Sequence, residues 1–467
     1  MATDQGQTVL EKLAHLVHSV RYEDLPADVV RRAKALVLDT LGCAYGGLRS
    51  QVGEAVQRMA ADCGGAPQAT LIGTGTRTSA ALATLVNGTL LRYLDGNDYY
   101  FARDPAHPSG NLAAALAVGE REGRSGADLL AALVAAYEVH LRLCDYAGEP
   151  SLWKRGWHHG THAQFSSSAL AARLSGHDPL RTAHAMAIAG SHQNTLAQLQ
   201  SGAVSMIKAT AEAWVAKAGV EAALLAGNGI TGPLPLMEGT AGWSATVAGQ
   251  VDLDALTAPL DGRYRLLGVS IKPYPVVATA VAPVRAAIEL HRAGLPDAAQ
   301  IKRVVVRLPS FALNTPSAHP GRRHPPHIES AQHSFYYCCA VALLDGACGE
   351  PQFTPQRLQS ADLSALLDKV ELAADPDLDT RWPAAAGGAV ELHLNGGAVH
   401  HRRCPYPPGH PHMALTDEEL AGKFLGHAEP VLTRARAEAL LDATLDLERC
   451  SNLRAFAALL GAPAAGG

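Results

Sequence analysis

Apolar residues recur every three or four positions through most of the first 260 residues, which is the spacing of one buried face of an α-helix. A short β segment is expected at Gln68–Gly73, before a Gly-Thr-Gly turn. Alanine fills many of the apolar positions, so we expect helix axes that pack closely. The predicted helices are Val9–Val20, Pro26–Leu41, Ser79–Leu94, Gly110–Glu122, Ala127–Cys144, Ala163–Leu174, Leu180–Ala189 and Ala203–Ala226.

The pattern changes after Gly262, where β-branched runs and a hairpin appear. Strands are predicted at Tyr264–Ile271, Ile301–Leu308, Ala389–Leu394 and Ala398–Arg402, and helices at Val276–His291 and Ser330–Leu344. Helical spacing returns at Asp417–Leu425, Leu432–Leu445 and Ala455–Leu460. We therefore predict a mainly α protein with a large all-helical domain (1–263), a smaller α+β lid domain (264–404) and C-terminal helices (405–467) that return to the helical domain.

Composition narrows the class of protein. The 39 basic and 44 acidic residues give a formal charge of −5 and form no basic block, which argues against nucleic-acid binding. No charge-free run is both long and apolar enough for a membrane span. The eight cysteines form no C-x-x-C pair and read as reduced thiols, and the N-terminus lacks a basic secretory n-region. We expect a cytoplasmic protein.

Two clusters of polar residues flank predicted helix ends in the first half of the chain. Asp95 and Asp98 follow the helix that ends at Leu94, and they could serve as a base and a hydrogen-bond acceptor. The alternative is a loop whose Asp and Asn residues satisfy backbone amides. His107 and Ser109 precede another helix, where free amides attract a carboxylate. The alternative there is a capped helix with a surface histidine.

Three further clusters carry histidine or lysine. His158, His159 and His162 precede a helix and favour an acid–base or oxyanion-binding imidazole, because histidine titrates near neutrality. Lys208 lies on an apolar helix face, where an ammonium is costly unless it meets an anion; snorkelling or an ion pair with Glu212 is the alternative. Lys272 opens the sequence Lys-Pro-Tyr-Pro at the predicted domain junction, which could instead be a rigid hinge.

A metal site is the competing interpretation of the histidines. It would use His158 and His162 with the region of His324 and His327, and it would make the protein a metal-dependent hydrolase. The chain has no H-E-x-x-H motif and no carboxylate at ligand spacing near the histidine cluster. We therefore expect no metal. A helical protein that has lost catalysis is a third possibility, which a buried lysine disfavours.

Taken in order, these clusters resemble the MmgE/PrpD family, which includes 2-methylcitrate dehydratase, cis-aconitate decarboxylase and iminodisuccinate epimerase. The resemblance runs over nearly the whole chain. Its motifs include Asn87-Gly88, Leu94-Asp95, His107-Pro108-Ser109, Gly156-Trp157-His158, Ser205-Met206-Ile207-Lys208, Lys272-Pro273-Tyr274-Pro275 and Ala331-Gln332-His333-Ser334 with Tyr337. The last motif is typical of the dehydratase-like branch.

The resemblance implies a cofactor-independent homodimeric enzyme with a helical domain, an α+β lid and a cleft for a small di- or tricarboxylate. It places the catalytic residues at Asp95, His107, His158, Lys208 and Lys272. Substrate contacts are expected from Asp98, Tyr99, Ser109, Thr161, His333, Ser334 and Tyr337. The chain departs from the family where Arg92 replaces a common histidine and where Gly96-Asn97-Asp98-Tyr99 replaces Phe-Asp-Asp-Thr.

The residues and the resemblance together predict a lyase that dehydrates a hydroxy di- or tricarboxylate similar to 2-methylcitrate. Cationic groups would neutralise a substrate carboxylate, so that the neighbouring carbon can lose its proton before water leaves. His158 and Asp95 are expected to transfer protons in an unassigned direction, and His107 and the two lysines to anchor the substrate. Decarboxylation, epimerisation or an altered substrate in specialised metabolism are the alternatives, because each passes through a similar carbanion-like state.

Overall fold

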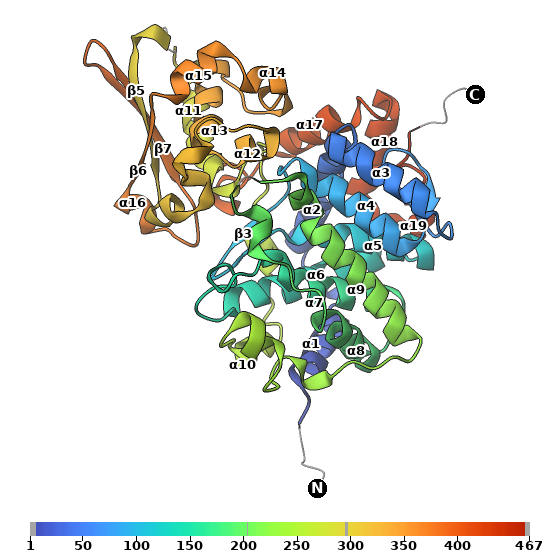
Figure 1. Cartoon of the computed structure of the whole chain (residues 1–467). Helices are drawn as coiled ribbons and strands as arrows, with labels where there is room; N and C mark the ends of the chain where they lie inside the picture. The colour runs from blue at the N-terminus through green and yellow to red at the C-terminus, as the bar shows by residue number, and fades with distance from the viewer. Residues whose placement is uncertain (1–5, 203, 295–297, 463–467) are drawn as a thin grey trace. The chain divides into compact units, whose positions relative to one another are not determined.

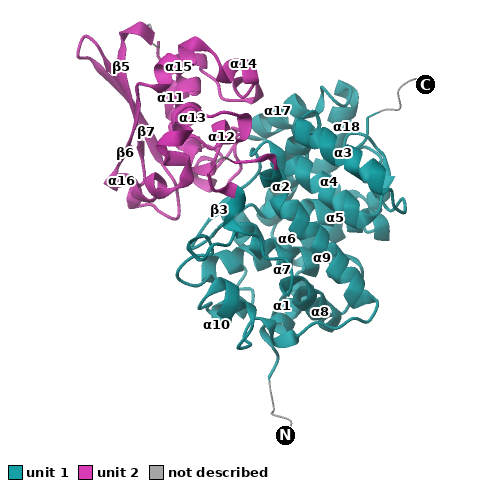
Figure 2. Cartoon of the chain, in the orientation of Figure 1, with its two compact units in different colours: residues 1–199, 207–269, 416–467 teal, residues 200–206, 270–415 magenta. Residues whose placement is uncertain are grey.

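The computed structural model describes residues 6–202, 204–294 and 298–462, and the chain forms two compact units (Figure 2). The first unit comprises residues 1–199, 207–269 and 416–467, and the second comprises 200–206 and 270–415. Helices dominate the described chain (Figure 1), so the predicted mainly α fold with a smaller α+β part is confirmed. The domain limits drawn after residues 263 and 404 stay predictions.

The first unit is helical, with short antiparallel strand pairs between helices. Its helices are α1 (Val9–Ser19), α2 (Ala27–Leu48), α3 (Gln51–Cys63), α4 (Ala80–Tyr93), α5 (Asn111–Glu122), α6 (Gly126–Tyr146), α7 (Ala163–Leu174), α8 (Pro179–Gly190), α9 (Ala211–Gly227), α10 (Leu253–Thr257), α17 (Asp417–Ala428), α18 (Arg434–Leu445) and α19 (Leu453–Ala457). The strand pairs are β1 (Ala69–Thr70) with β2 (Arg77–Thr78), and β3 (Tyr100–Phe101) with β4 (Pro105–Ala106). The segment predicted as β at 68–73 therefore contains a strand of two residues.

Small residues let α9 lie close to its neighbours. A Cβ atom added at Gly88 of α4 would lie 2.8 Å from the Cβ of Ala213 on α9, nearer than carbon atoms approach without a shift. On the other side of α9, a Cβ at Gly219 would lie 2.3 Å from Oγ of Ser167 on α7. This close packing fixes the ends of α4 and α9 with respect to each other, and both ends carry charged residues.

Two predicted elements are wrong in part. The segment 264–271 forms a 3₁₀ turn at Arg265–Gly268 and no strand, although its apolar residues Leu266 and Val269 are buried as expected. Helix α9 begins at Ala211, and a 3₁₀ turn at Met206–Thr210 precedes it, so Lys208 lies in that turn. Residue 203, inside the predicted helix, lies outside the described residues.

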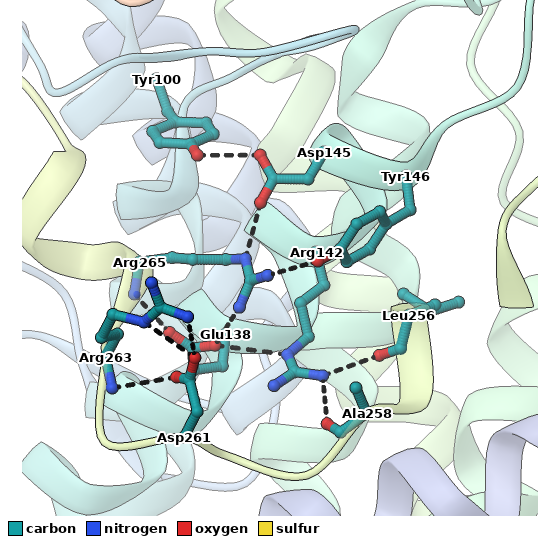
Figure 3. A network of polar contacts seen from close by, with 10 residues as sticks. All are labelled: Tyr100, Glu138, Arg142, Asp145, Tyr146, Leu256, Ala258, Asp261, Arg263 and Arg265. Carbon is teal, nitrogen blue, oxygen red and sulfur yellow. Dashed lines mark hydrogen bonds and ion pairs between the residues drawn. The ribbon is translucent and has the colours of Figure 1, made fainter. Parts of the chain in front are cut away.

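A buried ion network explains why the segment at Arg265 is not a strand (Figure 3). The Glu138 carboxylate on α6 accepts the backbone N–H of Arg265 at 2.5 Å, and it contacts the guanidinium groups of Arg265 at 3.1 Å and Arg142 at 3.3 Å. Arg265 Nε also meets Asp145 at 2.6 Å. Arg142 donates to the carbonyl oxygens of Leu256 and Ala258. The backbone donor that a sheet would use is therefore bonded to α6.

The second unit contains a four-stranded sheet in the order β6-β5-β7-β8. Its strands are β5 (Ile301–Leu308), β6 (Val370–Ala374), β7 (Gly388–Leu394) and β8 (Val399–Cys404); β5 pairs in parallel with β6 and antiparallel with β7, which pairs antiparallel with β8. Helices α11 (Val281–Arg292) and α13 (Phe335–Asp345) pack on the sheet, and their apolar residues join those of β5 and β7 in one core. The shorter helices are α12 (Ile328–Gln332), α14 (Pro355–Leu358), α15 (Ala361–Leu367) and α16 (Pro376–Asp379).

Other sequence features bear on the class of protein. Within the described ranges, none of the helices combines the length and apolar character that crossing a membrane requires. The eight cysteines are free thiols, as expected, and six of them are buried.

The predicted helix 330–344 is interrupted between α12 and α13, because Ser334 caps α13: its Oγ accepts the N–H of Tyr337 at 3.1 Å.

Candidate active site

A carboxylate held by two cations lies where α4 ends. Asp95 follows the last turn of α4 with φ = 55°, in the left-handed region that Asp tolerates better than most residues. Its Oδ1 forms ion pairs with the guanidinium of Arg92 and with Nζ of Lys208, the latter at 2.9 Å. All three side chains are buried. From the sequence, Lys208 was expected to meet an unidentified anion, with an ion pair to Glu212 as the alternative. In the structure its ion-pair partner is Asp95.

A second carboxylate extends this cluster from the first turn of α9. Glu212 Oε2 contacts Nε of Arg92 at 3.2 Å. Burial opposes the charge of Glu212, but Arg92 outweighs it and holds the pKa of the carboxyl well below its usual range. Burial likewise opposes the charge of Arg92, and Glu212 and Asp95 together raise its pKa. Arg92, Asp95, Lys208 and Glu212 thus form a buried group of two cations and two anions.

His158 lies beside this cluster, with a ring nitrogen within 4.8 Å of a carboxylate oxygen of Glu212. Its Nδ1 accepts the backbone N–H of Gly160 at 3.0 Å, which places the proton of the neutral ring on Nε2. Burial and the neighbouring His159 lower the pKa of His158 well below its usual value, so the ring is neutral. Its Nε2 is buried and has no hydrogen-bond partner in the structure. A buried donor without an acceptor is costly, so Nε2–H is a candidate to donate a hydrogen bond to a bound ligand.

His159 and His107 lie beside His158. The rings of His158 and His159 are 3.9 Å apart between centroids, and His107 meets the edge of His159 at 5.3 Å. His159 Nε2 lies 3.3 Å from Glu212 Oε1, within ion-pair range but without the alignment of a hydrogen bond. His107 Nδ1 bonds to the carbonyl oxygen of Asp98 at 2.6 Å, so Nδ1 is the donor. Three imidazoles therefore gather at one end of the charged cluster.

The loop after Asp95 is fixed by hydrogen bonds within the first unit. Asp98 accepts the N–H of Ser109 at 3.2 Å and the hydroxyl of Tyr137 at 2.8 Å. Asn97 donates to Oγ of Ser109 at 3.0 Å. Lys423 on α17 donates to the carbonyl oxygen of Gly96 at 2.7 Å. These contacts hold the loop that carries Asp95, which is the structural role that the sequence left open for Asp98 and Ser109.

Burial of Asp98 in this loop makes the stability of the protein depend on pH. Burial raises the pKa of Asp98 from 3.8 to about 6, despite its bonds to Ser109 and Tyr137. Because the pKa is higher in the folded than in the unfolded state, ionisation disfavours folding, so stability should fall as pH rises from about 4 to 6 and stay lowered above that range. Asp98→Asn should therefore raise the free energy of unfolding at pH 7 by about 2–3 kcal/mol and leave it similar below pH 4. Urea unfolding of both proteins across this range measures the effect.

The control for that experiment is Asp62→Asn, which removes an exposed carboxylate on α3. It should leave the slope of stability against pH as in the wild type. Equal slopes between pH 4 and 6 for the wild type and Asp98→Asn would contradict the assignment of this titration to Asp98.

Tyr99 and Thr161 are the other two residues of the first unit that are expected to contact the substrate. The ring of Tyr99 is 3% exposed and lies 5.1 Å from that of Phe101, between centroids. Oγ1 of Thr161 accepts the backbone N–H of Thr195 at 3.0 Å, which ties the histidine turn to the segment before α9. Both residues remain predicted contacts.

Four expected site residues belong to the second unit. Lys272 is fully buried, and its Nζ donates to the carbonyl oxygen of Val276 at 3.1 Å. Nδ1 of His333 bonds to the carbonyl oxygen of Glu329 at 3.0 Å. Ser334 donates to the carbonyl oxygen of Arg322, and Tyr337 to that of Gln352. Each has a local structural contact, and their roles toward a substrate stay predictions.

The metal interpretation fits poorly with the residues that come together. His158, His159 and Glu212 offer ligand atoms within 4.8 Å of one another. However, a metal at Nε2 of His158 would need the proton on Nδ1, and Nδ1 already accepts the N–H of Gly160. Arg92 also contacts Glu212 and would repel a cation. Of the histidines proposed earlier, His162 lies 3.1 Å from Asp104 and His324 pairs with Asp368 in the second unit.

Sequence reasoning did not assign Arg92, His159 or Glu212 to the site. One signal was available. Arg92 is the one charged residue of the predicted helix Ser79–Leu94, and Glu212 lies in the apolar stretch Ala211–Ala216. A charge within an apolar helix needs a buried partner, and two such charges of opposite sign are candidates for each other. His159 lay in the histidine cluster that the sequence favoured for acid–base chemistry, but nothing in the sequence distinguished it from His158 and His162.

Comparison with known proteins identifies the family of the chain. The family model of the MmgE/PrpD N-terminal domain matches residues 11–256, and that of the MmgE/PrpD C-terminal domain matches residues 274–448. Cis-aconitate decarboxylase of Mus musculus is 28% identical over 96% of this chain and 93% of its own length. The mitochondrial 2-methylcitrate dehydratase of Yarrowia lipolytica is 24% identical over 93% of this chain and 86% of its own. The chain therefore belongs to the MmgE/PrpD family.

Proposed function

We propose that this protein is a lyase that acts on a small di- or tricarboxylate without a metal or organic cofactor. The observation that carries the proposal is the buried cluster of Asp95, Lys208 and Arg92 beside the unpartnered Nε2–H of His158. Fixed cations and N–H donors in a buried site stabilise negative charge where it develops, and this is the main requirement for cleaving a bond next to a carboxylate. The family and its named relatives support the same class of substrate.

The neutral His158 suggests a direction for its part in the reaction. Loss of a proton or of CO₂ from a polycarboxylate leaves an electron pair on carbon, which spreads onto the oxygens of the adjacent carboxylate. His158 Nε2–H would donate to such an oxygen or to a departing hydroxyl group. Oδ1 of Asp95 is held by two cations, so we assign Asp95 to positioning Lys208.

Dehydration and decarboxylation both fit this chemistry. The dehydratase-like motif around His333 supports loss of water from a hydroxytricarboxylate. Decarboxylation is the second candidate, because cis-aconitate decarboxylase of Homo sapiens is 28% identical over 98% of this chain, more than the Yarrowia dehydratase. We keep dehydration as the leading reaction.

One assay separates the two reactions. Purified protein is incubated with 2-methylcitrate, citrate or cis-aconitate; the conjugated product is followed by ultraviolet absorbance and CO₂ is trapped. Dehydration is expected to give absorbance with a hydroxytricarboxylate and no CO₂, and decarboxylation CO₂ with cis-aconitate. Incubation with EDTA should leave the rate unchanged. Absence of both products with all three compounds would contradict the proposed function.

Three further expectations belong to the same proposal. Lys272 and His107 would anchor substrate carboxylates, and Lys272→Met should raise KM more than it lowers kcat.

A homodimer is proposed from the family resemblance, and light scattering of the full chain measures it. A reducing cytoplasm suits the eight free cysteines.

A further inference from the structure

We propose that His159 is a further catalytic residue, which exchanges the carbon-bound proton of the substrate at Nδ1, and that Glu212 and Arg92 are positioning residues for its ring. This inference rests on the proposed function and adds a proton carrier to it. Three segments supply the residues: Arg92 ends α4, His159 lies in the turn before α7, and Glu212 lies in the first turn of α9.

The three side chains form a chain of charge contacts. Arg92 Nε meets Glu212 Oε2 at 3.2 Å, and Glu212 Oε1 lies 3.3 Å from His159 Nε2. A carboxylate that is itself held by a guanidinium cannot easily turn away from the imidazole, so the orientation of the ring is constrained. The contact between Glu212 and His159 is poorly aligned in this structure, and such catalytic contacts commonly tighten when substrate binds.

The exposed fractions of the residues in the cluster favour His159 as the group that contacts a ligand. Asp95, Arg92 and Glu212 are at most 2% exposed, whereas His159 is 9% exposed. Its ring contacts that of His107, which is partly exposed. His159 and His107 are therefore the more exposed members of the cluster, and we infer that a molecule that reaches it meets their rings first.

The two stacked rings also offer complementary nitrogens. Despite burial, Arg92 keeps the pKa of Glu212 low, so Glu212 is ionised, and its Oε1 lies 3.3 Å from His159 Nε2, the ring nitrogen that would donate to it once the contact aligns. In the tautomer with the proton on Nε2, the lone pair of the His159 ring lies on Nδ1. His158 has the opposite arrangement, because its Nδ1 accepts from Gly160 and its Nε2 carries the proton. One ring is thus an acceptor and the neighbouring ring a donor, as a reaction that moves a proton and stabilises the resulting anion requires.

The step balances without a co-reactant. In the dehydration, the C–H bond next to a carboxylate breaks, its proton bonds to Nδ1, and its electron pair remains on the carbon and the adjacent carboxylate. That pair then forms the C=C bond while the C–O bond breaks, and the hydroxyl takes the proton of His158 Nε2–H and leaves as water; return of the proton held by His159 to His158 restores both rings. In a decarboxylation, Nδ1 first takes a proton from solvent; the C–C bond then breaks, CO₂ leaves, and the electron pair that remains on carbon takes the proton from Nδ1. The positive ring is stabilised by Glu212 in both cases.

The test is chemical rescue of His159→Ala. We expect kcat on 2-methylcitrate or cis-aconitate, whichever the wild type converts, to fall about 10²-fold or more. Added imidazole should restore part of the rate, because a free base can replace the missing ring. Calorimetry with tricarballylate, an unreactive tricarboxylate, should give a Kd within about threefold of the wild type, since the charged groups remain. His15→Asn, which removes an exposed histidine of α1, is the control.

A second variant covers the case in which His159→Ala does not fold. Glu212→Gln keeps the shape of the carboxylate but not its charge, and it should lower kcat about tenfold with KM within about twofold. Unchanged kcat in either folded variant would overturn the proposal, as would loss of tricarballylate binding in folded His159→Ala, which would make His159 a substrate-binding residue. Activity that EDTA abolishes and zinc restores would also overturn it, because His158, His159 and Glu212 would then be metal ligands.

The readouts keep this inference separate from the proposed function. Turnover by the wild type decides whether the protein is a lyase, and the ratio of variant to wild type decides the role of His159. If the wild type converts none of the compounds, exchange of the carbon-bound protons of tricarballylate in D₂O, followed by NMR, still measures proton transfer. Exchange by the wild type that His159→Ala retains in full would overturn the inference.

Discussion

Replacement of Lys208 by methionine should lower kcat/KM by about 10³-fold, the largest loss of activity that we expect from a single substitution. Lys208 Nζ lies 2.9 Å from Asp95 and is almost fully buried. Methionine keeps the apolar stem but removes the charge, so Asp95 loses one of its two cations and the site loses positive charge where an anion must be stabilised. Loss of one such group commonly costs 10²–10³ in kcat, and weaker substrate binding adds to it.

The matched control is Lys217→Met on α9. Lys217 is partly exposed and pairs with Glu221 one turn further along the same helix, so its removal should change kcat/KM by less than about twofold. Circular dichroism of both variants shows whether they fold. A folded Lys208→Met protein with more than a tenth of the wild-type kcat/KM would contradict the role of Lys208 in the site.

The sequence predicted the residues of this site better than the contacts between them. Asp95 and Lys208 are 113 positions apart, and family motifs selected both without showing that they form an ion pair. The apolar face alone suggested that Lys208 needs an anion, and Glu212 was the nearest in sequence. The 3₁₀ turn at Met206–Thr210 places Lys208 outside the regular helix, so spacing by four residues did not predict its partner.

The fold followed from helical spacing wherever a helix buries one continuous face, as at α1 and α17. Prediction failed where a polar contact overrides the local pattern. The apolar segment at 264–271 has the composition of a strand, yet the N–H of Arg265 bonds to Glu138, which lies 127 positions earlier. Such a contact depends on the packing of α6 and has no signature in a short stretch of sequence.

Replacement of Glu138 by leucine should lower the free energy of unfolding by about 3–5 kcal/mol, because it leaves two guanidinium groups without their shared carboxylate. Glu138 is fully buried and contacts both Arg142 and Arg265 (Figure 3). Burial already lowers the pKa of Arg142, and Glu138 opposes that shift. The substitution also removes the acceptor for the backbone N–H of Arg265. Urea unfolding, followed by circular dichroism, measures the loss.

The comparison that separates charge from packing is the double variant Glu138→Leu/Arg142→Leu. Removing Arg142 as well eliminates one of the stranded charges, so the double variant should be more stable than Glu138→Leu alone, by about 1–3 kcal/mol. Glu54→Gln, in an exposed pair with Arg58, should cost less than about 0.5 kcal/mol and serves as the control. If the double variant is no more stable than Glu138→Leu, the loss arises from the packing of α6 and from the missing backbone acceptor, and the network contributes little through its charges.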